Sequence, residues 1–354
     1  MTDEDPTPEE QPLPEGALPA DGATPSDGEP ELDPRKAARR RRRRLLRWAA
    51  TILVVGIVGF FFAVSLANNW AQVVEEDISF NPLWILTTVL FIVAVPVTGL
   101  LWGRIVTVLQ SDVHVAARES IAVQCASWIL KYVPGQVGSV VNKTVWAGKK
   151  GISRTLVVIS FIYENVFLQL ASLVPGSIIL LISLGPEIFG QNITLLLLPV
   201  LAIVPFALIS WKPFFHRIVD APARRVLKRP IPAEYFLSTP QTLRSSGEFV
   251  LPRAINAVGF VILAATIVPI SPAEWLPFAA AYMLAGAIGI LAFFVPSGLG
   301  VREAVIVLIL SQYIEVPQAI IISLLARLLA TIADGGVALI YVGLRRTISK
   351  EIRP

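Results

Sequence analysis

Charged residues are scarce in this chain of 354 residues. Asp, Glu, Lys and Arg together make up 16% of it, whereas a soluble globular protein has about 25%. Hydrophobic residues make up 54%, and the mean hydropathy is +0.66. Several apolar stretches reach about 20 residues, the length that a helix needs to cross the hydrocarbon core of a bilayer. The composition excludes an ordinary soluble domain and predicts an all-α polytopic membrane protein.

Cysteine and histidine are almost absent. Cys125 is the single cysteine, so the chain has no internal disulfide, and only His114 and His216 carry an imidazole. A His/Cys metal site is therefore not expected. The segment 138–144 ends like a phosphate-binding loop, but Asn142 stands where that loop requires glycine. We expect no metal, no cofactor, no ATP site and no nucleic-acid partner.

The first 47 residues form two blocks of opposite charge. Residues 1–34 hold eleven acidic residues and no Lys or Arg, and they are rich in proline, which predicts a disordered cytoplasmic tail. Residues 35–47 carry nine basic residues, which are expected to keep the N-terminus in the cytoplasm and to bind anionic lipid. The apolar run 48–74 that follows is too long for the hydrophobic part of a signal peptide.

Six apolar segments are long enough to span the membrane, and the Lys/Arg-rich connections between them all fall on one side. That asymmetry predicts a multi-pass protein of the cytoplasmic membrane with both termini in the cytoplasm. The transmembrane domain is assigned to residues 48–346 and a cytoplasmic tail to residues 347–354. The predicted spans cover residues 46–67, 82–106, 155–184, 193–211, 249–268 and 316–344.

Two further segments, residues 116–148 and 276–314, are apolar but interrupted by proline and glycine. Irregular backbone at membrane depth is tolerated only where it is buried in protein or lines a polar cavity. We interpret both as re-entrant helical hairpins, the first entering from the cytoplasm and the second from outside. If they are full crossings instead, the helix count changes but the sidedness of the ends does not. The residues that break the helices are Pro134, Gly135, Gly138, Pro296, Gly298 and Gly300.

The two breaks resemble each other. Segments 132–138 and 294–300 both read aromatic, Val, Pro, two variable residues, branched apolar, Gly. The spans that precede them run in opposite directions, so the pattern indicates an inverted repeat, and interrupted helices at matching places point to a transport site. The alternative is that proline and glycine are simply more frequent in membrane helices.

Three motifs and one arginine recur together in a known family. They are the break at 132–138, the KKGISR stretch at 149–154 ahead of Glu164, the P-S-G-L-G-V-R-E motif at 296–303, and Arg327. Across about residues 45–345 the chain resembles the transmembrane region of lysylphosphatidylglycerol synthase, also called the flippase-like membrane domain family. The resemblance implies translocation of lipid between leaflets.

Charged residues within the predicted helices are candidates for the site, because each costs about 2.5–3.5 kcal/mol to insert. Arg302 is expected to bind a phosphate or carboxylate through two hydrogen bonds at once. The alternative is a structural ion pair with Glu164 or Asp334. Glu164 is expected to pair with a basic headgroup, to balance Arg302, or to act as a proton-coupling site. Lys143 is a weaker candidate, because Asn142 and Lys143 stand where the family that this chain resembles has an arginine. The predicted substrate-binding residues are Lys131, Tyr132, Glu164, Arg302, Glu303, Arg327 and Asp334.

The sequence favours a transporter over an enzyme. We expect flippase-like translocation of a lipid or lipid-linked precursor with an anionic or phosphate-bearing headgroup. The alternative is a membrane-embedded aminoacyl- or glycosyl-transferase, or its non-catalytic partner subunit. The connection 212–247 is too short for an independent catalytic domain, and no aminoacyl-transferase domain is expected after the membrane region. Expected partners are membrane lipids, and a second copy of the chain or an envelope-biosynthesis protein.

Overall fold

The computed structural model describes residues 80–110, 115–130, 137–184, 204, 208, 211–227, 230–291 and 300–351. Within these ranges the secondary structure is entirely helical. The predicted tail, the basic segment 35–47, the predicted span 46–67 and nearly all of the span 193–211 lie outside the described residues, and so do most residues of both breaks.

In the part of the chain that the structure describes, four helical stretches are long and apolar enough to cross a membrane. They are α3 (Leu83–Leu109), α6 (Arg154–Leu184), the stretch Ala233–Ala265 and the greater part of α14 (Val316–Glu351). These helices confirm, by length and composition, the predicted spans at 82–106, 155–184, 249–268 and 316–344. Helix α14 continues past its predicted end to Glu351.

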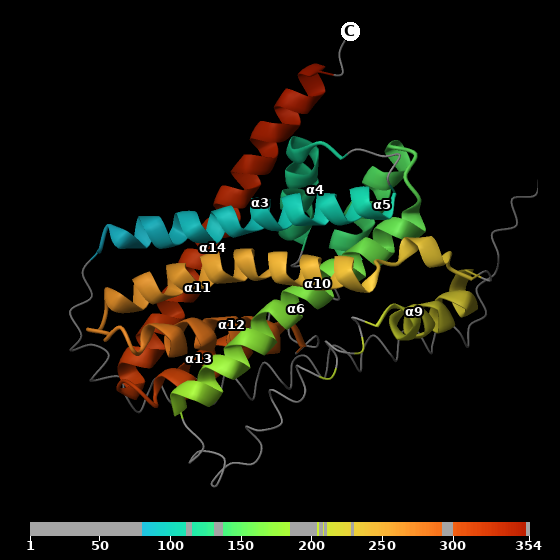
Figure 1. Ribbon diagram of the computed structural model, residues 1–354. Helices are drawn as coiled ribbons and strands as arrows, with labels where there is room; N and C mark the ends of the chain where they lie inside the picture. The colour runs from blue at the N-terminus through green and yellow to red at the C-terminus, as the bar shows by residue number, and fades with distance from the viewer. Residues whose placement is uncertain are drawn as a thin grey trace, which may run out of the picture. The chain divides into compact units, whose positions relative to one another are not determined.

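Helices α3 and α11 (Val250–Ala265) lie side by side (Figure 1). They approach closely at Gly259, where an added Cβ would lie 3.1 Å from the Phe91 ring. The Thr87 hydroxyl donates a hydrogen bond to the Gly259 carbonyl at 3.0 Å, and Trp84 Nε1 donates to Thr266 Oγ1 at 2.8 Å. A small residue and inter-helical hydrogen bonds are typical of packing between membrane helices, because burial of apolar surface gives little drive there.

Helices α4 (Ala117–Ile129) and α5 (Val137–Lys149) form an antiparallel pair. Where the N-terminus of α4 meets the C-terminus of α5, Trp146 Nε1 donates to Glu119 Oε1 at 2.8 Å. Near the break, Ser139 Oγ donates to the Ser127 carbonyl at 2.7 Å. The segment 116–148 is therefore a helical hairpin, and its re-entry from the cytoplasmic side stays a prediction.

Helices α12 (Trp275–Leu291) and α13 (Val301–Leu310) form the second pair. Helix α13 begins after Gly300, whose φ of 78° suits glycine because it has no Cβ. The Glu303 carboxylate accepts a hydrogen bond from the Gly300 N–H at 2.7 Å, which satisfies one of the free donors at the helix start. The two helices are antiparallel, since the Phe278 ring contacts that of Tyr313 beyond the C-terminus of α13.

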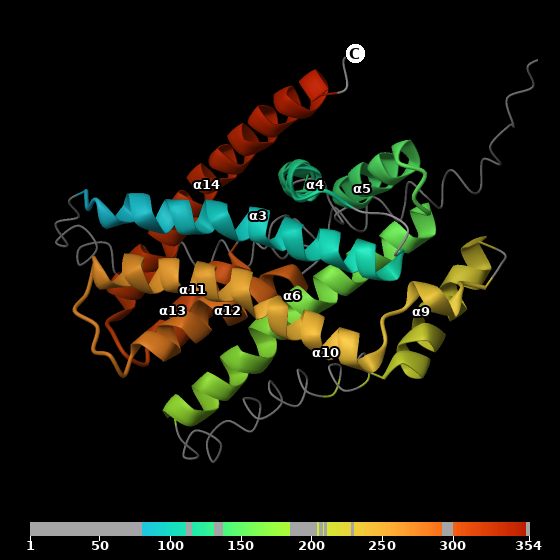
Figure 2. The ribbon, with the colours of Figure 1, turned by 45° about the horizontal axis from the view of Figure 1, so that its top comes forward.

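The helices divide into two groups with the same order of contacts (Figures 1 and 2). In the first group α3 contacts α4, α4 contacts α5 and α5 contacts α6; in the second, α11, α12, α13 and α14 repeat that order. Contacts between the groups also occur in exchanged pairs. Helix α6 contacts α12 and α14 contacts α4, and α3 contacts α11.

The connection 212–247 contains helices that the sequence analysis did not predict. It contains α9 (Lys212–Leu227), the short helix η3 (Ala233–Tyr235) and α10 (Thr239–Glu248), which leads into α11. Phe215 is buried against Tyr163, with ring centroids 4.8 Å apart. The Leu237 N–H donates to the Tyr163 hydroxyl at 3.1 Å. Helix α9 and the chain after it therefore pack on the N-terminal third of α6.

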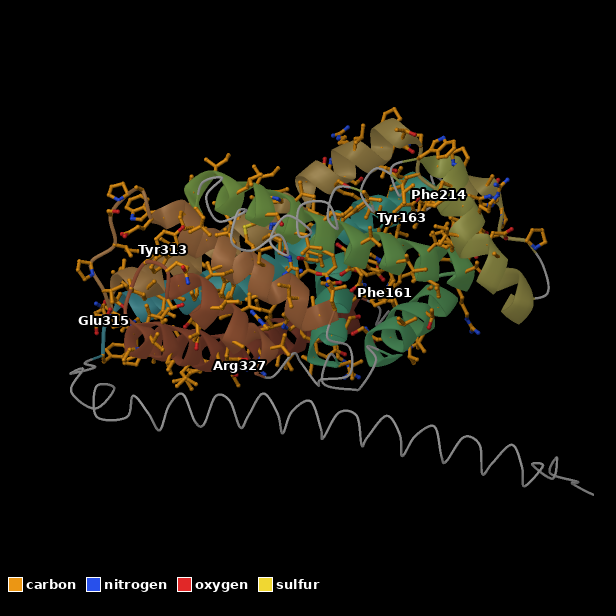
Figure 3. All side chains as sticks on the ribbon, turned by 90° about the horizontal axis from the view of Figure 1, so that it is seen from below. Phe161, Tyr163, Phe214, Tyr313, Glu315 and Arg327 are labelled. Carbon is orange, nitrogen blue, oxygen red and sulfur yellow. The ribbon has the colours of Figure 1, made fainter. Side chains whose placement is uncertain are left out.

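Figure 3 shows how labelled residues are distributed along the helices. Tyr313 and Glu315 lie at one end, Phe214 and Tyr163 lie toward the other, and Arg327 lies between them. The labelled residues therefore mark the two ends of the helices and a position between them.

Candidate functional site

The predicted site residues that the structure describes lie on several helices. Lys131, Tyr132, Pro134, Gly135, Pro296 and Gly298 lie outside the described residues. The others that the structure describes fall into separate places: Glu164 on α6, Gly138 on α5, Gly300 with Arg302 and Glu303 at the start of α13, and Arg327 and Asp334 on α14.

Glu164 is buried between α4, α5 and α6, with 3% of its surface exposed. One carboxylate oxygen pairs with the ammonium group of Lys143, which is itself 1% exposed. The other oxygen accepts a hydrogen bond from Gln124 Nε2 at 2.7 Å. Glu164 therefore balances Lys143 and not Arg302, which corrects one interpretation of the sequence.

Lys143 also lies over an aromatic ring. Its Nζ is 4.2 Å from the ring centroid of Trp102, whose Nε1 donates to Ser160 Oγ at 3.0 Å. A cation above an indole face gains further stabilisation when it is desolvated. The sequence ranked Lys143 low, yet the structure makes it the partner of the most buried predicted acid.

Glu303, Arg327 and Asp334 hold helices together. Glu303 caps Gly300 with one oxygen, and its other oxygen lies 3.8 Å from Arg327 Nη1 on α14. Asp334 accepts a hydrogen bond from Trp128 Nε1 of α4 at 2.7 Å. Arg327 and Asp334 thus contact different helices, α13 and α4 respectively.

Arg302 has a different environment. Its guanidinium carbon lies 5.4 Å from the ring centroid of Tyr282 on α12, and the side chain is partly buried. Among the described residues it has no carboxylate partner, so the alternative ion pair with Glu164 or Asp334 is not formed.

Arg253 is a second such arginine, and sequence reasoning missed it. It is partly buried on α11, and its Nε donates to the Leu168 carbonyl of α6 at 3.2 Å. Its Nη1 lies 3.8 Å from the position that a Cβ on Gly286 would occupy. Tyr282 and Gly286 are four residues apart on α12, so both guanidinium groups lie against the same face of that helix. No carboxylate in the described part of the chain pairs with Arg253.

Gln169 lies next to Leu168 on α6. Its Nε2 donates to the Ala287 carbonyl at 3.1 Å, while its buried Oε1 has no hydrogen-bond partner. Helix α12 thus meets two guanidinium groups and one carboxamide, which are groups that bind anions and hydroxyls. No group of three His, Cys, Asp or Glu side chains suited to a metal ion occurs among the residues that the structure describes.

The model of the lysylphosphatidylglycerol synthase transmembrane region matches residues 48–336. The chain belongs to this family. The match contains Lys143, Glu164, Arg253 and Arg302, and it confirms the resemblance seen in the motifs. Membership in the lysylphosphatidylglycerol synthase transmembrane family makes this a multi-pass membrane protein related to lipid modification or translocation. A comparison with curated proteins finds no match.

Proposed function

We propose that this protein translocates a lipid or lipid-linked precursor with an anionic headgroup between the leaflets of the cytoplasmic membrane. The observation that carries the proposal is the environment of Arg302. A guanidinium inside a membrane domain is costly unless it is neutralised, and no carboxylate does so in the described part of the chain. The phosphate of a lipid headgroup supplies the missing negative charge, and arginine binds it through two parallel hydrogen bonds.

The two groups of helices support an alternating-access movement. Their contacts occur in exchanged pairs, α6 with α12 and α14 with α4, which is the pattern expected of an inverted repeat. The helical pairs α4–α5 and α12–α13 stand at corresponding places in the two groups, and we propose that both re-enter the membrane. Rocking of one group against the other would then open the Arg302 site to each leaflet in turn.

The neighbourhood of Arg302 favours binding over catalysis. The groups gathered along α12 are guanidinium groups, a carboxamide and a phenol. The adjacent carboxylate, Glu303, is already engaged by the Gly300 N–H and by Arg327. A transferase needs a free acid, base or nucleophile near the reacting atoms. We therefore propose a transporter. The Lys/Arg-rich connections support the further proposal that both its termini lie in the cytoplasm.

A vesicle assay tests the proposal. The purified full chain is reconstituted into vesicles that contain fluorescently labelled phosphatidylglycerol in both leaflets, and dithionite is added to destroy the label that is accessible from outside. We expect the inner-leaflet label to be lost much faster than in protein-free vesicles. Arg302→Gln should slow that loss about tenfold or more, because a charge-assisted hydrogen bond contributes about 1.5–3 kcal/mol.

Arg244→Gln is the matched control. Arg244 is exposed on α10 and pairs with Glu248 one turn away, so its loss should leave the rate unchanged. A wild-type rate equal to that of empty vesicles would contradict the proposed function. An Arg302→Gln rate equal to wild type would remove Arg302 from the translocation path.

A further inference from the structure

Arg253 and Arg302 come from different helices and meet the same face of a third. Arg253 is on α11 and reaches Gly286, while Arg302 is at the start of α13 and reaches Tyr282, one turn away on α12. Both guanidinium groups are positively charged, and they contact positions one helical turn apart on α12. Such an arrangement is unfavourable in a medium of low dielectric constant unless negative charge lies between or beside the two groups.

Among the residues that the structure describes, no carboxylate supplies that charge nearby. Glu303 is occupied by Gly300 and Arg327, and Glu164 by Lys143 and Gln124. The segment 292–299, which joins α12 to α13, contains no Asp or Glu. In the described part of the chain, the guanidinium groups of Arg253 and Arg302 therefore both lack a negatively charged partner. The start of α13, with its unpaired N–H groups, adds a further positive partial charge.

The position of Arg302 is fixed by an aromatic stack. The ring of Tyr282 lies parallel to that of Phe91, with centroids 5.4 Å apart, and it also stacks on Phe260 at 4.7 Å. Phe260 is fully buried, so the stack is anchored in the core. The guanidinium of Arg253 is held in turn by its bond to the Leu168 carbonyl. Both cations are thus positioned before a ligand arrives, which reduces the entropy lost on binding.

We propose that Arg253 and Arg302 together select lipids whose headgroup ends in a phosphate monoester or diphosphate, with two negative charges, over singly charged phosphodiester lipids. This inference rests on the proposed function and names the substrate class of its site. A doubly charged phosphate offers enough oxygens to accept two hydrogen bonds from each guanidinium and neutralises both. A phosphodiester leaves one positive charge uncompensated.

A binding measurement tests this selection. The full chain in detergent micelles is titrated with dioctanoyl phosphatidic acid and with dioctanoyl phosphatidylglycerol, at about pH 8 so that the phosphomonoester carries its second charge. We expect phosphatidic acid to bind about tenfold tighter or more, since one guanidinium gains a charged partner only with this lipid. Inorganic phosphate, as a competitor at the same concentration, should not displace it, because it lacks acyl chains.

Three variants separate charge from folding. Arg253→Gln should remove the preference for phosphatidic acid, whereas Arg253→Lys, which keeps the charge but not the two-pronged geometry, should retain part of it. The exposed control Arg244→Gln should keep the full preference. Each variant is first compared with wild type by thermal unfolding and gel filtration.

Equal affinity of wild type for the two lipids would overturn the selection, and so would a full preference in Arg253→Gln. Displacement by inorganic phosphate at equal concentration would also overturn it, since free phosphate would then be the ligand. These outcomes leave the proposed function standing if phosphatidylglycerol still crosses vesicle membranes in an Arg302-dependent way. If the protein binds phosphatidic acid selectively but translocates no lipid, the proposed function is contradicted, whereas the proposed binding site at Arg253 and Arg302 is supported.

Discussion

Lys143 and Glu164 form an ion pair between α5 and α6 that is almost completely closed to solvent. Lys143 lies in the middle of α5, and Glu164 lies in the first half of α6. The pair fastens the second helix of the α4–α5 hairpin to a membrane-spanning helix, and Gln124 joins α4 to the same carboxylate. The hairpin is thus held by charge as well as by apolar packing.

Breaking this pair should destabilise the protein more than removing it. Lys143→Met leaves a buried carboxylate without its cation, and we expect it to cost about 3–5 kcal/mol. The double variant Lys143→Met/Glu164→Met should recover most of that loss, because no buried charge remains. Thermal unfolding in detergent measures both.

Lys150→Met is the control for that experiment. Lys150 is half exposed and pairs with Glu119, so its replacement should change stability by about 1 kcal/mol or less. If Lys143→Met were as stable as this control, the buried pair would not hold the hairpin.

Close packing of α3 on α4 at Gly99 gives a second prediction. An added Cβ would lie 2.7 Å from the Gln124 Cβ and 3.1 Å from the Ser120 carbonyl oxygen, so Gly99→Ala must separate the helices. We expect a loss of about 1–3 kcal/mol. Gly335→Ala, on α14, meets no atom within 4 Å and should be neutral or stabilising. Equal unfolding temperatures for the two variants would mean that α3 and α4 are not packed this tightly.

Cysteine labelling tests the membrane topology. Lys149→Cys and Ser271→Cys place thiols at exposed positions that are predicted to be cytoplasmic and external respectively. A membrane-impermeant maleimide should label intact cells at residue 271 and only opened cells at residue 149. The buried native Cys125 serves as the internal control and should stay unlabelled. The reverse pattern would overturn the assignment of both sides.

The contact between α6 and the segment after α9 depends on one hydroxyl. Tyr163→Phe removes the acceptor for the Leu237 N–H, and we expect a loss of about 1–3 kcal/mol because that buried donor is left unpaired. Hydrogen exchange of residues 231–238 should accelerate selectively. Unchanged exchange there would show that packing of Phe215 alone fixes the segment.

The long helices were predictable because their signal is length and apolar composition. Helices α3, α6 and α14 end within a few residues of their expected bounds, except that α14 runs on to Glu351. The helices of 212–247 were not foreseen, since tertiary contacts such as Phe215 on Tyr163 order them. One local signal was present: Ser238 and Gln241 form a capping box at the start of α10.

The candidate site was only partly predictable. The late motif identified Arg302, which the structure describes at the start of α13. Arg253 was missed because it stands near the start of a predicted span, where an arginine is expected to reach water. The Lys143–Glu164 pair was missed as well, because sequence alone does not say which helices become neighbours.

Translocation rates of labelled phosphatidylglycerol for wild type, Arg302→Lys and Arg302→Gln, taken in one set of vesicles, decide whether Arg302 receives the headgroup. The environment of Arg302 predicts that wild type is fastest, that lysine, with its charge but without the two-pronged geometry, is intermediate, and that glutamine is about tenfold slower or more. Three equal rates, from variants that unfold at the same temperature, would contradict it.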